Sequence, residues 1–300
     1  MKFKLLLPII SLLIFLGGCS ASYKQLSKME NKEPKNFQEH LLSEYKKRAS
    51  FEAEEMHDWN SAKLYSEKAL KSLETDEIYP EEISYWKIPE ENINEIKIAY
   101  DNLMTIYKDA KNIDPINLAR AISSLDCWSE QQEENWQTWD INSCKNDFLK
   151  AMHNIYEKIS ITENVQETLN NKDNNLLRYN LAVIQQSLNM NKEARINYNY
   201  LIKNEKNLKA MINLYNIDIT EANYYEAFNT IESILKIKTI ENVVKDKAFV
   251  LYKLNRIEEA KKIEESSNQI LEFTREVKGL PEKDKIKIIE ALWSIIYSNK

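Results

Sequence analysis

The sequence predicts an all-α protein built from antiparallel helical hairpins. Only three of its 300 residues are glycine, and Gly279 alone lies beyond residue 18. Turns with positive φ, β-hairpins and phosphate-binding loops depend on glycine, so this composition favours helices joined by corners rich in Asn, Asp and Lys. Apolar residues recur at helical spacings of three and four, and a Glu-Ala pair recurs with a fixed period. Both patterns indicate packed helices.

Residues 1–18 have the layout of a lipoprotein signal peptide. A short basic segment precedes the apolar run Leu5 to Leu16, and Gly17-Gly18-Cys19 follows, as in the bacterial lipobox. The alternative is an ordinary signal peptide with an incidental cysteine. We expect cleavage before Cys19 and attachment of acyl chains such as palmitate to Cys19, which would anchor the protein in a membrane. Ser20 replaces the aspartate typical of inner-membrane retention, which favours the outer membrane, with the body facing the periplasm.

The mature chain divides into four expected segments. Residues 19–36 are polar and are expected to form a tether. Residues 37–160 form a helical module, and residues 161–175, which are rich in asparagine, form a linker. Residues 176–300 form a second domain of helical repeats.

The helical module contains five predicted helices. Phe37–Met56 and Trp59–Leu73 form a first hairpin, and the broken segment Thr75–Asn92 wraps over it. A third helix includes Ile96 to Ile106. Asp114-Pro115 supplies an N-cap and a first-turn proline for a fourth helix. The fifth helix has the clearest apolar stripe, which runs from Ile141 to Ile159 and includes Cys144.

The second domain contains a repeat of 33 residues. Glu-Ala pairs end at Ala194, Ala227 and Ala260, and the segment Tyr179–Lys203 resembles a tetratricopeptide repeat. The alternative is a set of helical hairpins of similar length in which the Glu-Ala pairs coincide by chance. Gly279 and Pro281 predict a helix stop followed by a last helix, Pro281–Ser298.

Cys127 and Cys144 are the two cysteines of the predicted periplasmic body. Cysteines in an oxidising compartment are expected to pair, and closing this loop would contribute roughly 3 kcal/mol in the chain-entropy model. A redox-active pair is the minor alternative. Trp128, Trp136 and Trp139 cluster around the same loop. They either fill the core at a helix corner or form an exposed aromatic surface for a partner.

Little in the sequence points to catalysis, a metal or a cofactor. His40, His57 and His153 have no metal-ligand spacing, and the cysteines do not form a zinc motif. Glu133 and Glu134 are adjacent, so their side chains diverge on a helix instead of converging on one substrate. Nucleotide-binding and hydrolase motifs are missing. The formal charge of −6 disfavours nucleic acid as a partner. We therefore expect no enzyme activity, no cofactor and no metal.

Residues 125–148 carry a family resemblance. Leu125-Asp-Cys-Trp128, the acidic and amide-rich run Glu130–Glu134, Trp136-Gln137, Cys144 and Phe148 resemble a block in the N-terminal helical region of alphaproteobacterial OmpA-family outer-membrane lipoproteins. Upstream, Tyr45–Glu55 and Trp86 with Pro89 also fit. Those proteins end in an OmpA-like domain that binds peptidoglycan. Nothing after residue 160 is similar to that domain, so the resemblance does not extend to peptidoglycan binding.

Together these observations predict a lipid-anchored lipoprotein of the outer membrane that acts as a protein-interaction scaffold. Its repeat domain would bind a protein or peptide in a groove. One alternative is an envelope-assembly subunit, like the helical lipoprotein of the barrel-assembly machine. A second alternative is a structural lipoprotein associated with the cell wall.

Overall fold

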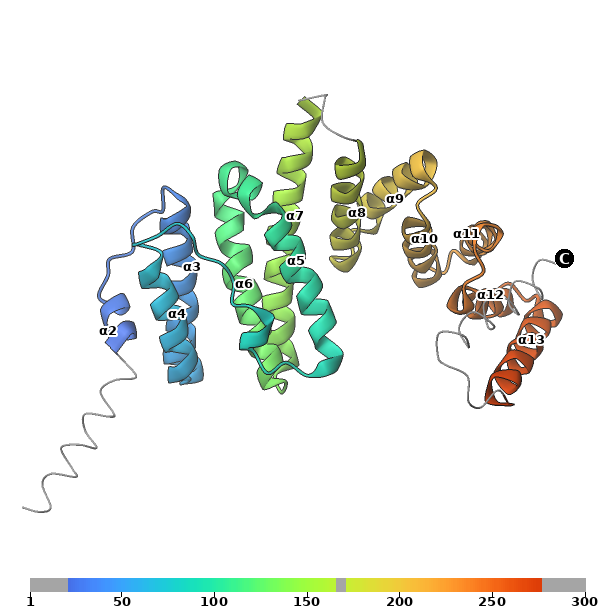
Figure 1. Ribbon diagram of the computed structural model, residues 1–300, viewed down its shortest axis with the longest axis horizontal. Helices are drawn as coiled ribbons and strands as arrows, with labels where there is room; N and C mark the ends of the chain where they lie inside the picture. The colour runs from blue at the N-terminus through green and yellow to red at the C-terminus, as the bar shows by residue number, and fades with distance from the viewer. Residues whose placement is uncertain (1–20, 166–170, 277–300) are drawn as a thin grey trace, which may run out of the picture. The chain divides into compact units, whose positions relative to one another are not determined.

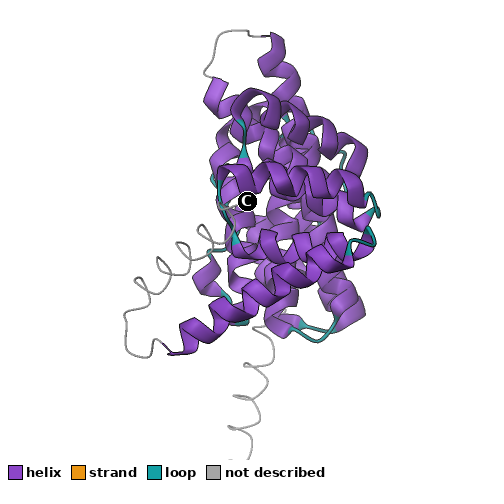
Figure 2. Cartoon of the chain, turned by 90° about the vertical axis from the view of Figure 1, so that its right-hand side faces the viewer, coloured by secondary structure: helices purple, strands orange, loops and turns teal. Residues whose placement is uncertain are grey.

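A computed structural model describes residues 21–165 and 171–276 of the chain (Figure 1). Within these two ranges every regular element is a helix, and neither range contains a strand (Figure 2). The all-α prediction is therefore confirmed for this part of the chain. Cys19, the expected signal peptide 1–18 and the expected last helix Pro281–Ser298 lie outside the described residues. The chain divides into two compact units, Met1–Leu169 and Asn170–Lys300.

The first described element corrects the expectation of a tether over residues 19–36. Residues Ala21–Ser27 form helix α2, which packs against the first unit. Leu26 is fully buried, and the ring of Tyr23 meets the edge of Trp59 at a centroid distance of 6.1 Å. The largely polar composition concealed these two side chains, whose burial removes apolar surface from water and holds the helix in place.

Two contacting helices follow, and they match the first predicted pair. Helix α3 (Phe37–Phe51) continues into a short π-helix (Glu52–Met56), and α4 (Trp59–Lys71) comes next. Asn36 caps α3, and Asp58 caps α4 by accepting hydrogen bonds from the backbone of its first turn. His57 separates the π-helix from α4 and has a left-handed backbone, with φ 57°.

The segment between α4 and the next helix lies over the unit in a partly irregular path. It includes one 3₁₀ turn, Ile83–Tyr85, and buries Ile78, Trp86 and Ile88. The Tyr107 hydroxyl donates a hydrogen bond of 2.9 Å to the carbonyl of Ile78. These contacts explain why a stretch with two prolines is ordered without being helical.

Three long helices complete the first unit: α5 (Glu90–Ile113), α6 (Pro115–Glu134) and α7 (Thr138–Val165). Asp114 accepts a hydrogen bond from the backbone of Asn117, and Pro115 occupies the first turn of α6, as predicted. Helix α6 contacts α3, α5 and α7 (Figure 1). Every residue from 121 to 132 is buried, so α6 is the centre of the unit.

The second unit contains six described helices, and the helices on either side of the boundary between the units extend into the expected linker. Helix α7 ends at Val165 and α8 begins at Asn171, so ten residues of the expected linker 161–175 are helical. Each helix of the second unit contacts the next one along the chain, and α8 also contacts α10. The helices are α8 (Asn171–Ser187), α9 (Asn191–Glu205), α10 (Leu208–Thr220), α11 (Tyr224–Ile237), α12 (Glu241–Lys253) and α13 (Ile257–Glu276).

Three corners of the second unit have the same backbone geometry at intervals of 33 residues. Asn189, Ala222 and Asn255 each have φ 59°, in the left-handed region. At each corner the next backbone N–H donates a hydrogen bond to a carbonyl five residues earlier, at distances of 2.8, 2.8 and 2.9 Å. This bond and the left-handed residue match the Schellman motif that ends helices.

The sequence period also matches the packing of the second unit. Ala194, Ala227 and Ala260 are all fully buried, five residues after each left-handed corner. Their small side chains allow neighbouring helices to approach closely. Each alanine belongs to a separate apolar cluster, and each cluster draws on consecutive helices.

Candidate functional site

The predicted pairing of Cys127 and Cys144 is present in the structure. The disulfide joins α6 to α7, with sulfur atoms 2.01 Å apart and Cα atoms 5.7 Å apart. Both cysteines are buried. Arg48 of α3 lies beside the bond: one guanidinium nitrogen is 3.8 Å from the Cys144 sulfur, and the other donates to the Ser124 hydroxyl at 3.1 Å. The disulfide therefore belongs to a packed junction of three helices.

The three tryptophans near this loop have two different environments. Trp128 is only 2% exposed and packs against Phe148 at a ring distance of 6.0 Å. Trp136 and Trp139 are 71% and 64% exposed. Trp128 must therefore be removed from the possible partner surface, because it occupies the inward face of α6. Trp136 follows the end of that helix, and Trp139 lies in the first turn of α7.

A buried polar network around Asp126 was missed at the sequence level. Its carboxylate, on α6, accepts hydrogen bonds from the Tyr45 hydroxyl and the Lys68 ammonium, both at 2.6 Å. It also accepts one from the backbone N–H of Glu81 at 2.7 Å, and Lys68 forms a second ion pair with Glu81 at 2.9 Å. Asp126 is 1% exposed, so these partners balance a charge that is costly to bury.

Glu130 extends the polar face one turn further along α6. The Tyr65 hydroxyl donates a hydrogen bond to one of its carboxylate oxygens, and the other oxygen is buried without a partner. Burial raises the pKa of Glu130 to about 7, although the hydrogen bond from Tyr65 opposes the rise. Ile122, Asp126 and Glu130 are spaced by four residues, so they share one helix face. In the sequence, the four-residue spacing of Asp126 and Glu130 was the signal that could have indicated this polar face.

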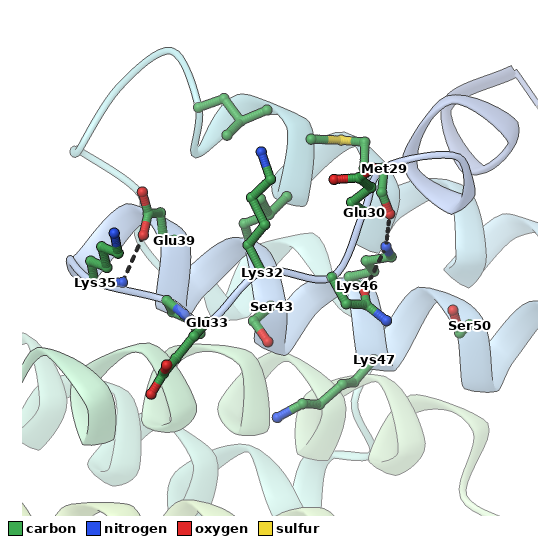
Figure 3. A pocket seen from close by; sticks show the side chains of 14 residues that line it. Met29, Glu30, Lys32, Glu33, Lys35, Glu39, Ser43, Lys46, Lys47 and Ser50 are labelled. Atoms are coloured by element: carbon green, nitrogen blue, oxygen red, sulfur yellow. Dashed lines mark hydrogen bonds between the residues drawn. The ribbon is translucent and has the colours of Figure 1, made fainter.

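One cavity lies between the chain that connects α2 to α3 and helix α3 itself. Its volume is about 1180 Å³. Lysine and glutamate side chains of the connecting segment and of α3 line it (Figure 3). Lys46 donates hydrogen bonds to the Met29 carbonyl and the Asn31 side chain, and the Lys35 backbone donates to Glu39. These charged groups bind the connecting segment to α3, which gives the cavity a structural explanation.

The other residues singled out from the sequence are not brought together. His153 is buried on α7, with Nε2 3.6 Å from the Glu157 carboxylate four residues later. In the described ranges, no group of three or more His, Cys, Asp and Glu side chains is placed to hold a metal ion. None of the described helices is long and apolar enough to cross a membrane.

The second unit presents large apolar side chains on its surface. Arg178 lies over the ring of Tyr200 at 4.1 Å, and Lys253 lies over that of Phe249 at 5.3 Å. Such side chains anchor many protein interfaces when they gather on one face. The exposed set is Leu176, Ile196, Tyr200, Tyr225, Ile237, Phe249, Tyr252 and Ile257.

Comparison of the chain with models of protein families, with curated proteins and with solved structures gave no match.

Proposed function

We propose that this protein is a lipid-anchored lipoprotein of the outer membrane that faces the periplasm and acts as a protein-interaction scaffold, without enzyme activity. Acyl chains on Cys19 would hold it at the membrane. Residues 37–160 would serve as a disulfide-stapled module of antiparallel helical hairpins. Residues 176–300 would form tetratricopeptide-like repeats whose groove receives a protein or peptide. The resemblance of residues 125–148 to OmpA-family lipoproteins supports the envelope location.

The observation that carries this proposal is the threefold recurrence of one helix corner in the second unit. Left-handed residues 189, 222 and 255 share the same backbone angle, and the buried alanines follow at the same distance. The contact between α8 and α10 joins the first helices of two successive pairs. Stacked helical pairs of this kind generate extended surfaces that bind other proteins.

In-cell crosslinking tests the scaffold proposal. A photo-crosslinking amino acid at Tyr252, which is 38% exposed on α12, is expected to capture a discrete protein partner. Ile98, which is 53% exposed on α5 of the first unit, is the matched control position. The same crosslinked proteins from both positions, or no crosslinked protein from Tyr252, would contradict a partner groove. Capture of a β-barrel protein would favour the envelope-assembly alternative, and retention on purified peptidoglycan would favour the cell-wall alternative.

Fractionation tests the anchor separately. Mature protein with the native Cys19 is expected in the outer-membrane fraction, whereas a Cys19→Ala form is expected to lose the acyl chains and leave that fraction. Persistence of the Cys19→Ala form in the membrane fraction would argue against a lipid anchor.

A further inference from the structure

A small cavity lies where the π-helix after α3 meets the start of α4 and the end of α6. Its volume is about 450 Å³, which falls within the range of small-ligand sites, roughly 300–1,000 Å³. The lining combines three carboxylates with two indoles and one imidazole. We call it the acidic aromatic pocket, and these six residues are Glu52, Asp58, Glu134, Trp59, Trp136 and His57.

Glu52 is the central residue of this pocket. It is only 3% exposed, and its carboxylate takes part in no hydrogen bond or ion pair with any described residue. Asp58 and Glu134, in contrast, accept hydrogen bonds from the backbone of α4 and from the Trp136 indole. A buried carboxylate is costly unless a cation or hydrogen-bond donor meets it. Glu52 therefore faces an open cavity without a cation or donor from the described residues, and it can serve as a counter-ion when it gives up its proton.

The local backbone explains how Glu52 reaches this position. The π-helix Glu52–Met56 widens the last turn after α3, and the backbone N–H groups of His57 and Asp58 both donate to the Glu52 carbonyl. Insertions of this kind redirect side chains and occur frequently at functional sites. Here the widened turn holds Glu52 at the junction of three helical segments.

Carboxylates at the start of α4, on α6 and on α7 add to the negative potential at Glu52. Burial is the largest cause that raises its pKa, and the charges of Glu130, Asp58, Glu134 and Asp140 raise it further, to about 8. Among the described residues that line the pocket, none is lysine or arginine. The nearest acidic groups thus compete for protons instead of being neutralised by a basic side chain.

Two indoles give the pocket faces that suit an organic cation. Trp59 is 45% exposed, and its ring is supported by Tyr23. The indole N–H of Trp136 donates to the Glu134 carboxylate at 3.3 Å, which ties the exposed ring to the acidic lining. Ammonium and guanidinium groups are attracted to indole faces, whereas hard metal ions prefer several oxygen ligands.

We infer that the acidic aromatic pocket binds the cationic side chain of a basic peptide, with Glu52 as the counter-ion and Trp59 and Trp136 as the walls. Asp58 and Glu134 contribute charge and bring hydrogen-bond acceptors to the rim. This site lies in the first unit and does not depend on the proposed scaffold role of the second unit.

Titration of the purified full-length chain with small peptide mimics tests the site. The probes are N-acetyl-arginine amide and N-acetyl-lysine amide, with N-acetyl-citrulline amide as the neutral match for arginine. Calorimetry and tryptophan fluorescence are expected to show saturable binding of a cationic probe and at least tenfold weaker binding of the citrulline probe. Equal binding of arginine and citrulline probes, or saturation by neither cationic probe, would overturn the inference.

Three variants localise the binding. Glu52→Gln keeps the shape of the side chain and is expected to weaken binding by roughly 10- to 150-fold, the range for a charged hydrogen bond. Trp136→Ala is expected to weaken it by roughly 2- to 30-fold. Trp139→Ala removes an equally exposed indole outside the pocket and should leave affinity unchanged. Circular dichroism checks that each variant is folded, and a folded Glu52→Gln chain with unchanged affinity would refute the assignment.

Discussion

The two units of this protein are stabilised in different ways. The first surrounds one central helix, α6, whose polar residues find partners on segments far away in the sequence. The second repeats one corner and one buried alanine, and its contacts join each helix to the next one along the chain, with an additional contact between α8 and α10. In the first unit no contact pattern recurs along α6, and a disulfide joins α6 to α7. The second places similar corners and similar buried alanines between successive helices.

The pairing of Lys68 with Asp126 offers the largest expected effect. Lys68→Ala would leave a carboxylate that is 1% exposed without its cation, which costs about 3–5 kcal/mol of unfolding free energy. Lys63→Ala is the matched control, because Lys63 lies on the same helix and pairs with Glu67 at the surface, where the cost is about 0–1 kcal/mol. Denaturant unfolding measures both variants, and equal losses would contradict the proposed importance of the buried network.

Removal of the disulfide is expected to have the next largest effect. Replacing both Cys127 and Cys144 with alanine should lower the stability of the first unit by roughly 3 kcal/mol, because the unfolded chain gains conformational freedom. Hydrogen exchange followed by mass spectrometry of the full chain should show faster exchange in α6 and α7. Helices α8 to α13 should keep their wild-type rates, and a matching acceleration there would break the distinction between the units.

A pH dependence should also separate the two units. Folding raises the pKa of Glu52 to about 8 and that of Glu130 to about 7, so the folded state holds protons that the unfolded state has lost. The corresponding stability is present below about pH 4.5 and is lost as pH rises through 7 and 8, at up to about 1.4 kcal/mol per unit of pKa shift.

Exchange rates measured at pH 6 and pH 9, after correction for intrinsic chemistry, should therefore show destabilisation of α3, α4 and α6 at the higher pH. Glu52→Gln should reduce this dependence to the part that Glu130 contributes, because glutamine does not titrate. Stability of the wild-type first unit that stays constant, or that increases from pH 6 to pH 9, would be inconsistent with buried protonated carboxylates.

The smallest expected effect concerns the repeated corners of the second unit. Ala222 has φ 59°, where a β-carbon is unfavourable, whereas Asn255 at the equivalent corner tolerates this conformation better. Ala222→Gly should raise stability by about 1 kcal/mol, and Asn255→Gly should change it less. Thermal unfolding of both variants measures the difference. Destabilisation by Ala222→Gly would mean that the three corners are not equivalent in solution.

The sequence by itself was sufficient for the features that depend on local patterns. The scarcity of glycine and the helical spacing of apolar residues predicted the helices, including the start of α6 at Pro115. The 33-residue period marked Ala194, Ala227 and Ala260 as equivalent positions, and the structure shows that all three are buried. The predicted signal peptide led to the expectation that Cys127 and Cys144 pair. Each of these inferences needed only the residue types and their spacing along the chain.

Only the tertiary structure decided which polar side chains are buried. Tyr45 and Asp126 are 81 residues apart, Lys68 and Asp126 are 58 apart, and Tyr65 and Glu130 are 65 apart. The same holds for Leu26, whose burial turns part of the expected tether into a packed helix. A carboxylate is buried or solvated according to the partners that other elements bring to it. Those partners are set by how helices pack, which the periodicity of a single helix does not specify.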